Sequence, residues 1–131
     1  MTTDTMTIRQ MCDAFDVTPR TLRFYEAKEL LAPERKGTRR LFTRRDRTRL
    51  KMILRGKKYG LSLEDIRQLL DLYQKGSDNT EQLARAYQMG RARLEEMEKQ
   101  RAELDVLIED LSGELDWGDK MLASKPDVTA A

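Results

Sequence analysis

The segment VTPRTLRFYEAKELL, residues 17–31, combines a helix-start signal with two arginines and an aromatic pair. Thr18 is a residue type that caps helices with its side chain, and Pro19 follows where a first helical residue would stand. Proline suits that position because its missing N–H would have no partner within the helix. We therefore expect a helix from Pro19 to about Lys28.

The apolar and basic residues of this helix fall on different sides. Leu22 and Tyr25 are three residues apart and share the inner face, whereas Arg20 and Arg23 share another. A shorter amphipathic segment precedes it, with a potential N-cap at Thr7. Two short helices joined by about three residues, the second rich in arginine, have the outline of a helix-turn-helix. The first of them has its apolar residues at the helical spacing: Ile8, Met11, Cys12 and Phe15.

Residues 30–43 predict a wing, that is, a two-stranded hairpin. They contain a proline, a glycine between basic residues and the apolar pair Leu41-Phe42, so the turn should lie near Lys36 and Gly37. Two further helices follow. Thr43 and Ser62 are their expected N-caps, and Gly60 ends the first of the two. Their apolar stripes are Leu50, Ile53 and Leu54 in the first, and Ile66, Leu69, Leu70 and Tyr73 in the second.

A heptad pattern begins after residues 75–79. It predicts a helix over residues 80–117 whose narrow apolar seam has no partner of sufficient length in the rest of the chain, so a second copy is the expected partner. A helix that folds back on its own N-terminal domain is the alternative. Residues 120–131 carry no periodicity and are predicted to be disordered. The apolar seam residues are Leu83, Tyr87, Leu94, Met97, Leu104, Ile108, Leu111 and Leu115, and Gly90 and Arg101 interrupt them.

Composition restricts the function. The 131 residues contain no histidine and one cysteine, so His-based catalysis, the common zinc sites and an internal disulfide are not expected, and we predict no cofactor and no enzymatic activity. Neither a signal peptide nor a spanning helix is apparent, which predicts a cytoplasmic protein that does not contact membranes. Residues 1–60 hold 16 basic against 7 acidic residues, whereas the rest hold 9 against 16. The basic half suits a polyanion such as DNA.

The basic residues of the first half come from three predicted elements. Arginine can bind phosphate or guanine with two hydrogen bonds, so we expect these elements to form one DNA-binding face. The residues are Arg20 and Arg23 on the second helix, Arg35, Lys36, Arg39 and Arg40 in the wing, and Arg44, Arg45, Arg47 and Arg49 at the start of the third helix.

The string TIRQMCDAFDVTPRTLRFYEAKELL resembles the N-terminus of the MerR family of bacterial transcription regulators, and the resemblance continues through residues 6–115. It implies a mainly α-helical fold with a winged helix-turn-helix domain over residues 6–75. Family members are homodimers joined by an antiparallel coiled coil. They bind a palindromic promoter element on double-stranded DNA and, in activators, distort its spacer for RNA polymerase. The segment GTRRLFTRRDRTRLKMILRGKKYGLSLEDI is similar to a branch regulating branched-chain amino acid and acyl-CoA degradation.

The resemblance also implies DNA-contact residues. Arg20 matches a position that enters the major groove, and Arg23 and Tyr25 match groove and phosphate contacts. The wing matches the family pattern less closely than the helices do. It can be aligned in two ways that differ by one residue, so either Arg39 or Arg40 occupies the wing position. No effector site is recognisable after Leu115, so any small-molecule effector is unknown. The DNA-binding set is Thr18, Arg20, Thr21, Arg23, Tyr25, Arg35, Lys36, Arg39, Arg40 and Arg44.

Two other functions compete with this interpretation. A coiled-coil interaction or adaptor protein without specific DNA binding would not need basic residues in both the wing and the second helix. An RNA-binding protein would need exposed aromatic side chains for stacking on unpaired bases, and the basic half offers few. The sequence therefore favours a dimeric, sequence-specific DNA-binding regulator.

Overall fold

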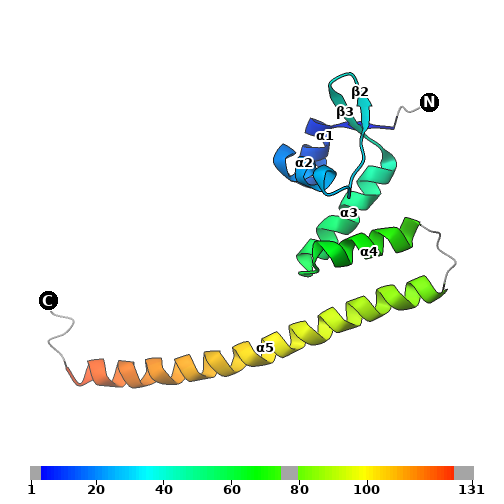
Figure 1. Ribbon diagram of the computed structural model, residues 1–131. Coiled ribbons are helices and arrows are strands. Elements are labelled where there is room, and N and C mark those ends of the chain that lie inside the picture. Colours follow the sequence, from blue (N-terminus) through cyan, green and yellow to red (C-terminus); the bar gives the residue numbers. More distant parts are fainter. Residues whose placement is uncertain (1–3, 75–79, 126–131) are drawn as a thin grey trace. The chain divides into compact units, whose positions relative to one another are not determined.

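The computed structural model describes residues 4–74 and 80–125 and confirms a mainly helical fold. The chain forms two compact units, residues 1–89 and 90–131, with the boundary inside the last helix. Figure 1 shows the elements in order along the chain: β1 Met6–Thr7, α1 Ile8–Phe15, α2 Pro19–Ala27, β2 Glu34–Lys36, β3 Arg39–Phe42, α3 Arg44–Lys58, α4 Leu63–Gln74 and α5 Thr80–Ala123.

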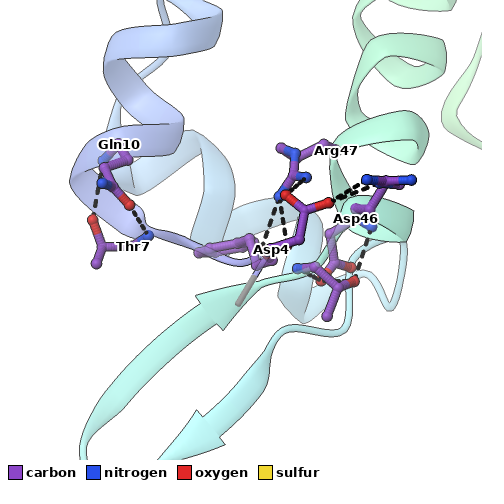
Figure 2. Close-up of polar contacts among 8 residues, drawn as sticks. Asp4, Thr7, Gln10, Asp46 and Arg47 are labelled. Carbon is purple, nitrogen blue, oxygen red and sulfur yellow. Dashed lines mark hydrogen bonds and ion pairs between the residues drawn. The ribbon is translucent and has the colours of Figure 1, made fainter. Parts of the chain in front are cut away.

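The helix-turn-helix begins and ends where its capping residues predict. Thr7 accepts a hydrogen bond from the Gln10 backbone at 3.2 Å and donates its own N–H to the Gln10 side chain at 2.9 Å (Figure 2). This reciprocal capping box starts α1. Asp16 ends α1 in the left-handed conformation, with φ of 54°, and Thr18 caps α2 through the backbone N–H of Thr21.

The wing is part of a three-stranded antiparallel sheet in the order β1-β3-β2. Its turn contains Gly37, whose φ of 65° is unfavourable for residues with a side chain. Across the hairpin Arg40 lies opposite Arg35, and Arg39 lies opposite Lys36. The sequence pattern did not predict β1, because its two residues are too few to show an alternation.

One apolar core joins these elements. Thr43 is the N-cap of α3, as predicted, and forms a capping box with Asp46. Near the end of α3 the helix passes close to α4, since a Cβ added at Gly56 would lie 2.7 Å from Cγ1 of Ile66. Glycine therefore sets the distance between α3 and α4. The buried apolar residues are Met11, Leu22, Tyr25, Leu30, Leu31, Phe42, Leu50, Ile53, Ile66 and Leu70.

Tyr73 does not belong to this core, so its predicted place on the inner stripe of α4 is wrong. Its side chain is 63% exposed. The close approach of α3 and α4 lies near the end of α3 and the start of α4, and the other ends of the two helices separate. There they leave a cavity of about 410 Å³, lined by Tyr73 together with Arg44, Arg45, Thr48, Arg49 and Leu70.

The last helix, α5, is longer than predicted. It continues to Ala123, so residues 120–123, which we expected in a disordered tail, are helical. Lysine, methionine, leucine and alanine all favour helix, and this preference extends α5 without any heptad pattern. Ser124 and Lys125 follow the helix, and residues 126–131 of the predicted tail and the predicted domain end at residue 75 lie outside the described residues.

Candidate nucleic-acid interface

The start of α2 presents arginine to the solvent. Arg20 and Arg23 are exposed, whereas Leu22 is fully buried against the core. The Thr18 and Thr21 hydroxyls form a hydrogen bond, with their oxygens 2.9 Å apart. Thr18 also caps the helix by accepting the Thr21 backbone N–H. The threonines therefore fix the first turn from which the two arginines project.

Tyr25 contributes its ring to the core and is 5% exposed. Burial raises the pKa of its hydroxyl, so the group stays protonated and able to donate a hydrogen bond at neutral pH. Its ring is tilted against that of Phe24, with the ring centres 5.7 Å apart. The predicted packing role of Tyr25 is present, and its phosphate contact stays a prediction.

The side chains on the two faces of the wing make different contacts. Arg35 and Arg40 point towards α2, where they bind the two carboxylate oxygens of Glu26 at 3.0 and 2.7 Å. Lys36 and Arg39 lie opposite each other in the strand register, on the other face of the hairpin, and both are exposed. Glu26 therefore holds the wing against α2 and leaves Lys36 and Arg39 exposed to solvent.

The pKa of the Glu26 carboxyl makes its contact with Arg35 and Arg40 dependent on pH. Burial by itself would raise its pKa, but hydrogen bonds from Arg40 and Arg35 and their charges bring the pKa below the usual value. A lowered folded-state pKa means that the carboxylate stabilises the fold above its ordinary pKa and that this contribution disappears as pH falls through the folded pKa.

We expect Glu26→Gln to be less stable than the natural protein at pH 7, because two arginines lose their anionic partner. The difference in free energy of unfolding should shrink as pH falls from about 4.5 through the lower folded-state pKa of Glu26, because below that pKa both proteins carry a neutral group at residue 26. Urea unfolding at several pH values measures this difference. A difference that stays constant down to pH 3 would show that charge does not hold the wing.

The start of α3 contains cations of two kinds. Arg44 is 82% exposed and Arg45 is also exposed, whereas the Arg47 side chain is 15% exposed. Asp4 binds Arg44 at 2.7 Å and Arg47 at 2.8 Å, and Figure 2 shows its carboxylate next to Arg47. The arginine hydrogen bonds and charges, chiefly the bond from Arg44, hold the pKa of Asp4 below its usual value. Arg47 thus fastens the N-terminal segment to α3.

Other basic side chains of the expected face hold the fold instead. Nε of Arg49 donates to the Leu30 carbonyl at 2.7 Å, which fixes the segment after α2 against α3. We expected Arg47 and Arg49 on the DNA face. Their partners Asp4 and Leu30 could not be predicted, because contacts between residues far apart in the chain leave no local pattern. The exposed cations on these elements are Arg20, Arg23, Arg35, Lys36, Arg39, Arg44 and Arg45, of which Arg35 is paired with Glu26 and Arg44 with Asp4.

The described residues offer little else that would define a site. Over residues 4–74 and 80–125, no three His, Cys, Asp or Glu side chains are grouped so as to hold a metal ion. No helix in the same ranges is long and apolar enough to cross a membrane. Helix α2 and the wing both carry exposed basic residues, and a helix-turn-helix with such a wing defines a winged helix-turn-helix protein.

Comparison with known proteins identifies the family. The MerR HTH family regulatory protein model matches residues 6–72, and the MerR DNA-binding model matches residues 47–113. The chain belongs to the MerR family and is a DNA-binding transcription regulator. It is 35% identical to the HTH-type transcriptional regulator ZntR of Escherichia coli over 99 residues, which cover 74% of this chain and 69% of that protein.

Three solved structures of transcription regulators are similar to this chain. HiNmlR, described as a MerR family regulator lacking the sensor domain and bound to promoter DNA, superposes with a TM-score of 0.64 and 26% identity, covering 91% of this chain and 94% of that one. A MerR family regulator from Bacillus cereus gives a TM-score of 0.60 at 28% identity, with 76% and 74% covered. SkgA from Caulobacter crescentus gives 0.52 at 31%, with 86% and 78% covered.

Proposed function

We propose that the protein acts as a homodimer that binds a palindromic promoter element and distorts its spacer, so that RNA polymerase can engage the promoter. The observation that carries the DNA contact is the exposure of Arg20 and Arg23 on the first turns of α2, above a buried Leu22. The HiNmlR complex supports the same use of the fold, since that regulator is bound to promoter DNA. A bacterial protein with this role works in the cytoplasm.

The homodimer is supported by the exposure of the predicted seam. Along α5 the apolar seam residues are between 41% and 71% exposed in the single chain. Such a stripe is unfavourable in water and becomes stable when a second helix covers it. The seam residues with these exposures are Leu83, Tyr87, Leu94, Met97, Leu104, Ile108, Leu111 and Leu115.

In this proposal Arg20 reads base edges in the major groove, while Arg23, Arg44 and the Tyr25 hydroxyl bind backbone phosphate. Arginine is suited to guanine because its two donors match the two acceptors of that base in the major groove. Arg35 and Arg40 support these contacts indirectly, since both are bound to Glu26. Distorting the spacer costs a few kcal/mol, which phosphate contacts on both sides must offset.

The first test is binding to the promoter upstream of the protein's own gene. Mobility shift and footprinting with excess nonspecific competitor should give a symmetric protected region over the promoter spacer. Light scattering of the free protein should give the mass of a dimer. A footprint without symmetry, or no preference over random duplex, would contradict the proposed mode of binding.

The wing provides a comparison between neighbouring arginines. If Arg39 is the wing residue that binds phosphate, Arg39→Ala should weaken binding to all duplexes alike and reduce the slope of log affinity against log salt by about one unit. Arg40→Ala should change the slope less, because this arginine is already bound to Glu26. Binding measured at several salt concentrations decides between them. The opposite ranking would assign the phosphate contact to Arg40.

We also propose that the regulated genes belong to branched-chain amino acid or acyl-CoA degradation. The support is the similarity of residues 37–66 to that branch of the family. Repeating the footprint with added acyl-CoAs, and with free coenzyme A as the control, tests this assignment. A footprint that no acyl-CoA changes would remove the support for such an effector.

A further inference from the structure

Helix α2 carries two adjacent aromatic residues, and only one of them serves the core. Tyr25 is 5% exposed, whereas Phe24 is 46% exposed. Within the part of the chain that the structure describes, Phe24 belongs neither to the buried core nor to the partly buried apolar residues that pack against it. An apolar ring in water gives up the free energy that burial would release. The side chain of Phe24 therefore needs an explanation outside the core.

The position of Phe24 places it on the outer side of α2. Residues three, four and seven apart lie on the same side of an α-helix, and the buried Leu22 lies on the other side. The exposed residues of α2 that have this spacing are Arg20, Arg23, Phe24 and Ala27. Phe24 therefore adds an apolar ring to the surface that also carries the two arginines.

Two neighbours restrict the ring of Phe24. The ring of Tyr25, which is itself buried, lies tilted against it at an interplanar angle of 58°, with the ring centres 5.7 Å apart. The ammonium group of Lys28 lies over the Phe24 ring, with Nζ 5.7 Å from its centre, where a cation is attracted to the aromatic face. These contacts favour one orientation of the exposed ring, so the ring is presented to a partner in a defined place.

Phenylalanine can distinguish bases in the major groove through one group only. Its side chain is a hydrocarbon and neither donates nor accepts a hydrogen bond, so the polar edges of adenine, guanine and cytosine offer it nothing specific. Thymine alone presents an apolar group in that groove, the C5 methyl, and phenylalanine is one of the side chains that contact it. The contact removes both apolar groups from water. A thymine methyl is therefore the base feature that fits an exposed phenylalanine.

The other uses of an exposed phenylalanine fit this surface less well. Apolar wedges that enter between base pairs act from the minor groove, whereas the second helix of a helix-turn-helix enters the major groove. A protein partner that covered Phe24 would also cover Arg20, which is about one helical turn away, and would compete with DNA. Stacking on unpaired bases requires a single strand. The arginines beside the ring thus favour duplex DNA as its partner.

We propose that Phe24 is a specificity-determining residue that contacts the C5 methyl of a thymine in the major groove. Side chains four residues apart on a helix have Cβ atoms about 6 Å apart, and base pairs follow each other at about 3.4 Å, so the thymine lies within about two base pairs of the one that Arg20 reads. The inference rests on the major-groove contact of α2 in the proposed function. It adds an apolar base contact beside the hydrogen-bonded contact of Arg20.

Removal of a single methyl group from the DNA tests this contact. The full chain first selects its best-bound duplex from a random pool, so the probe does not depend on the choice of promoter. Each thymine of that duplex is then replaced in turn by uracil, which pairs with adenine in the same way and lacks only the C5 methyl. At one thymine in each half-site, the natural protein should bind the uracil duplex about threefold to fivefold more weakly.

Two substitutions connect this thymine to Phe24. Phe24→Ala should bind the thymine and uracil duplexes with equal affinity, because the methyl has lost its partner. Phe24→Leu keeps an apolar side chain, so it should retain part of the preference for thymine. Arg23→Ala is the matched control from the same side of α2, and it should weaken binding to both duplexes alike and leave their ratio at the natural value. Far-UV circular dichroism shows that each variant is folded.

The outcomes separate the role of Phe24 from the proposed function. A pool from which no sequence is enriched would overturn sequence-specific binding, and the assignment of Phe24 with it. An enriched duplex in which no uracil replacement changes the affinity would overturn the thymine contact alone. A Phe24→Ala variant that still prefers thymine over uracil by the natural ratio would assign the methyl contact to another residue and overturn the role of Phe24.

Discussion

Replacing Asp46 by alanine is expected to lower the free energy of unfolding by about 3 kcal/mol, because three part-buried hydrogen bonds lose their acceptor. Asp46 is 2% exposed. Its carboxylate accepts hydrogen bonds from the Ala32 backbone at 3.1 Å, the Thr43 backbone at 3.0 Å and the Thr43 hydroxyl at 3.1 Å. It therefore caps α3 and holds the segment between α2 and the wing.

Asp65 provides a matched control for this prediction. It occupies the same position in α4, three residues after Ser62, whose hydroxyl accepts the Asp65 backbone N–H at 3.0 Å. Within the described residues its carboxylate has none of the long-range bonds that Asp46 makes, so Asp65→Ala should cost about 1 kcal/mol or less. Urea unfolding followed by circular dichroism compares the two. Equal losses would mean that the contact to Ala32 contributes little.

Replacing Arg20 by alanine is expected to lower affinity for the operator by about 1 to 3 kcal/mol, or roughly 5-fold to 150-fold, if the guanidinium reads a base pair. Affinity for random duplex should fall much less, because the lost contacts are with base edges rather than phosphate. Competition binding with operator and random DNA at one salt concentration measures both. The ratio of the two affinities is the quantity that decides the role of Arg20.

Arg55 is the control for charge in this experiment. It is exposed in the last turn of α3, so Arg55→Ala removes one positive charge without altering α2. We expect it to leave the ratio of operator to random affinity unchanged. If Arg20→Ala also leaves that ratio unchanged, Arg20 binds backbone phosphate and the base contact belongs to another residue.

Local signals in the sequence predicted the helices well because each signal acts within one turn of a helix. Thr7, Thr18 and Thr43 cap their helices as expected, and Pro19 stands at the first position of α2. The end of α5 was misplaced because helix preference continued after the heptad pattern stopped, so the predicted tail began too early.

Which arginines form ion pairs within the fold and which are exposed could not be predicted from the sequence. Arg40 and Arg39 are neighbours of the same type, yet one binds Glu26 and the other is exposed, because adjacent residues of a strand point to opposite faces. Which face meets α2 depends on how the hairpin packs. Similarly, Arg47 holds Asp4, which is 43 residues away in the chain.

The helix-turn-helix, the wing and the uncovered seam of α5 could be predicted from local sequence, because caps, turns and heptads depend on neighbouring residues. Packing between distant segments fixes which cations hold the fold, such as Arg40 and Arg49, and which ones face solvent, such as Arg20 and Arg39. Ion pairs and close approaches between distant segments depend on packing, and the close approach of α3 to α4 at Gly56 is one example.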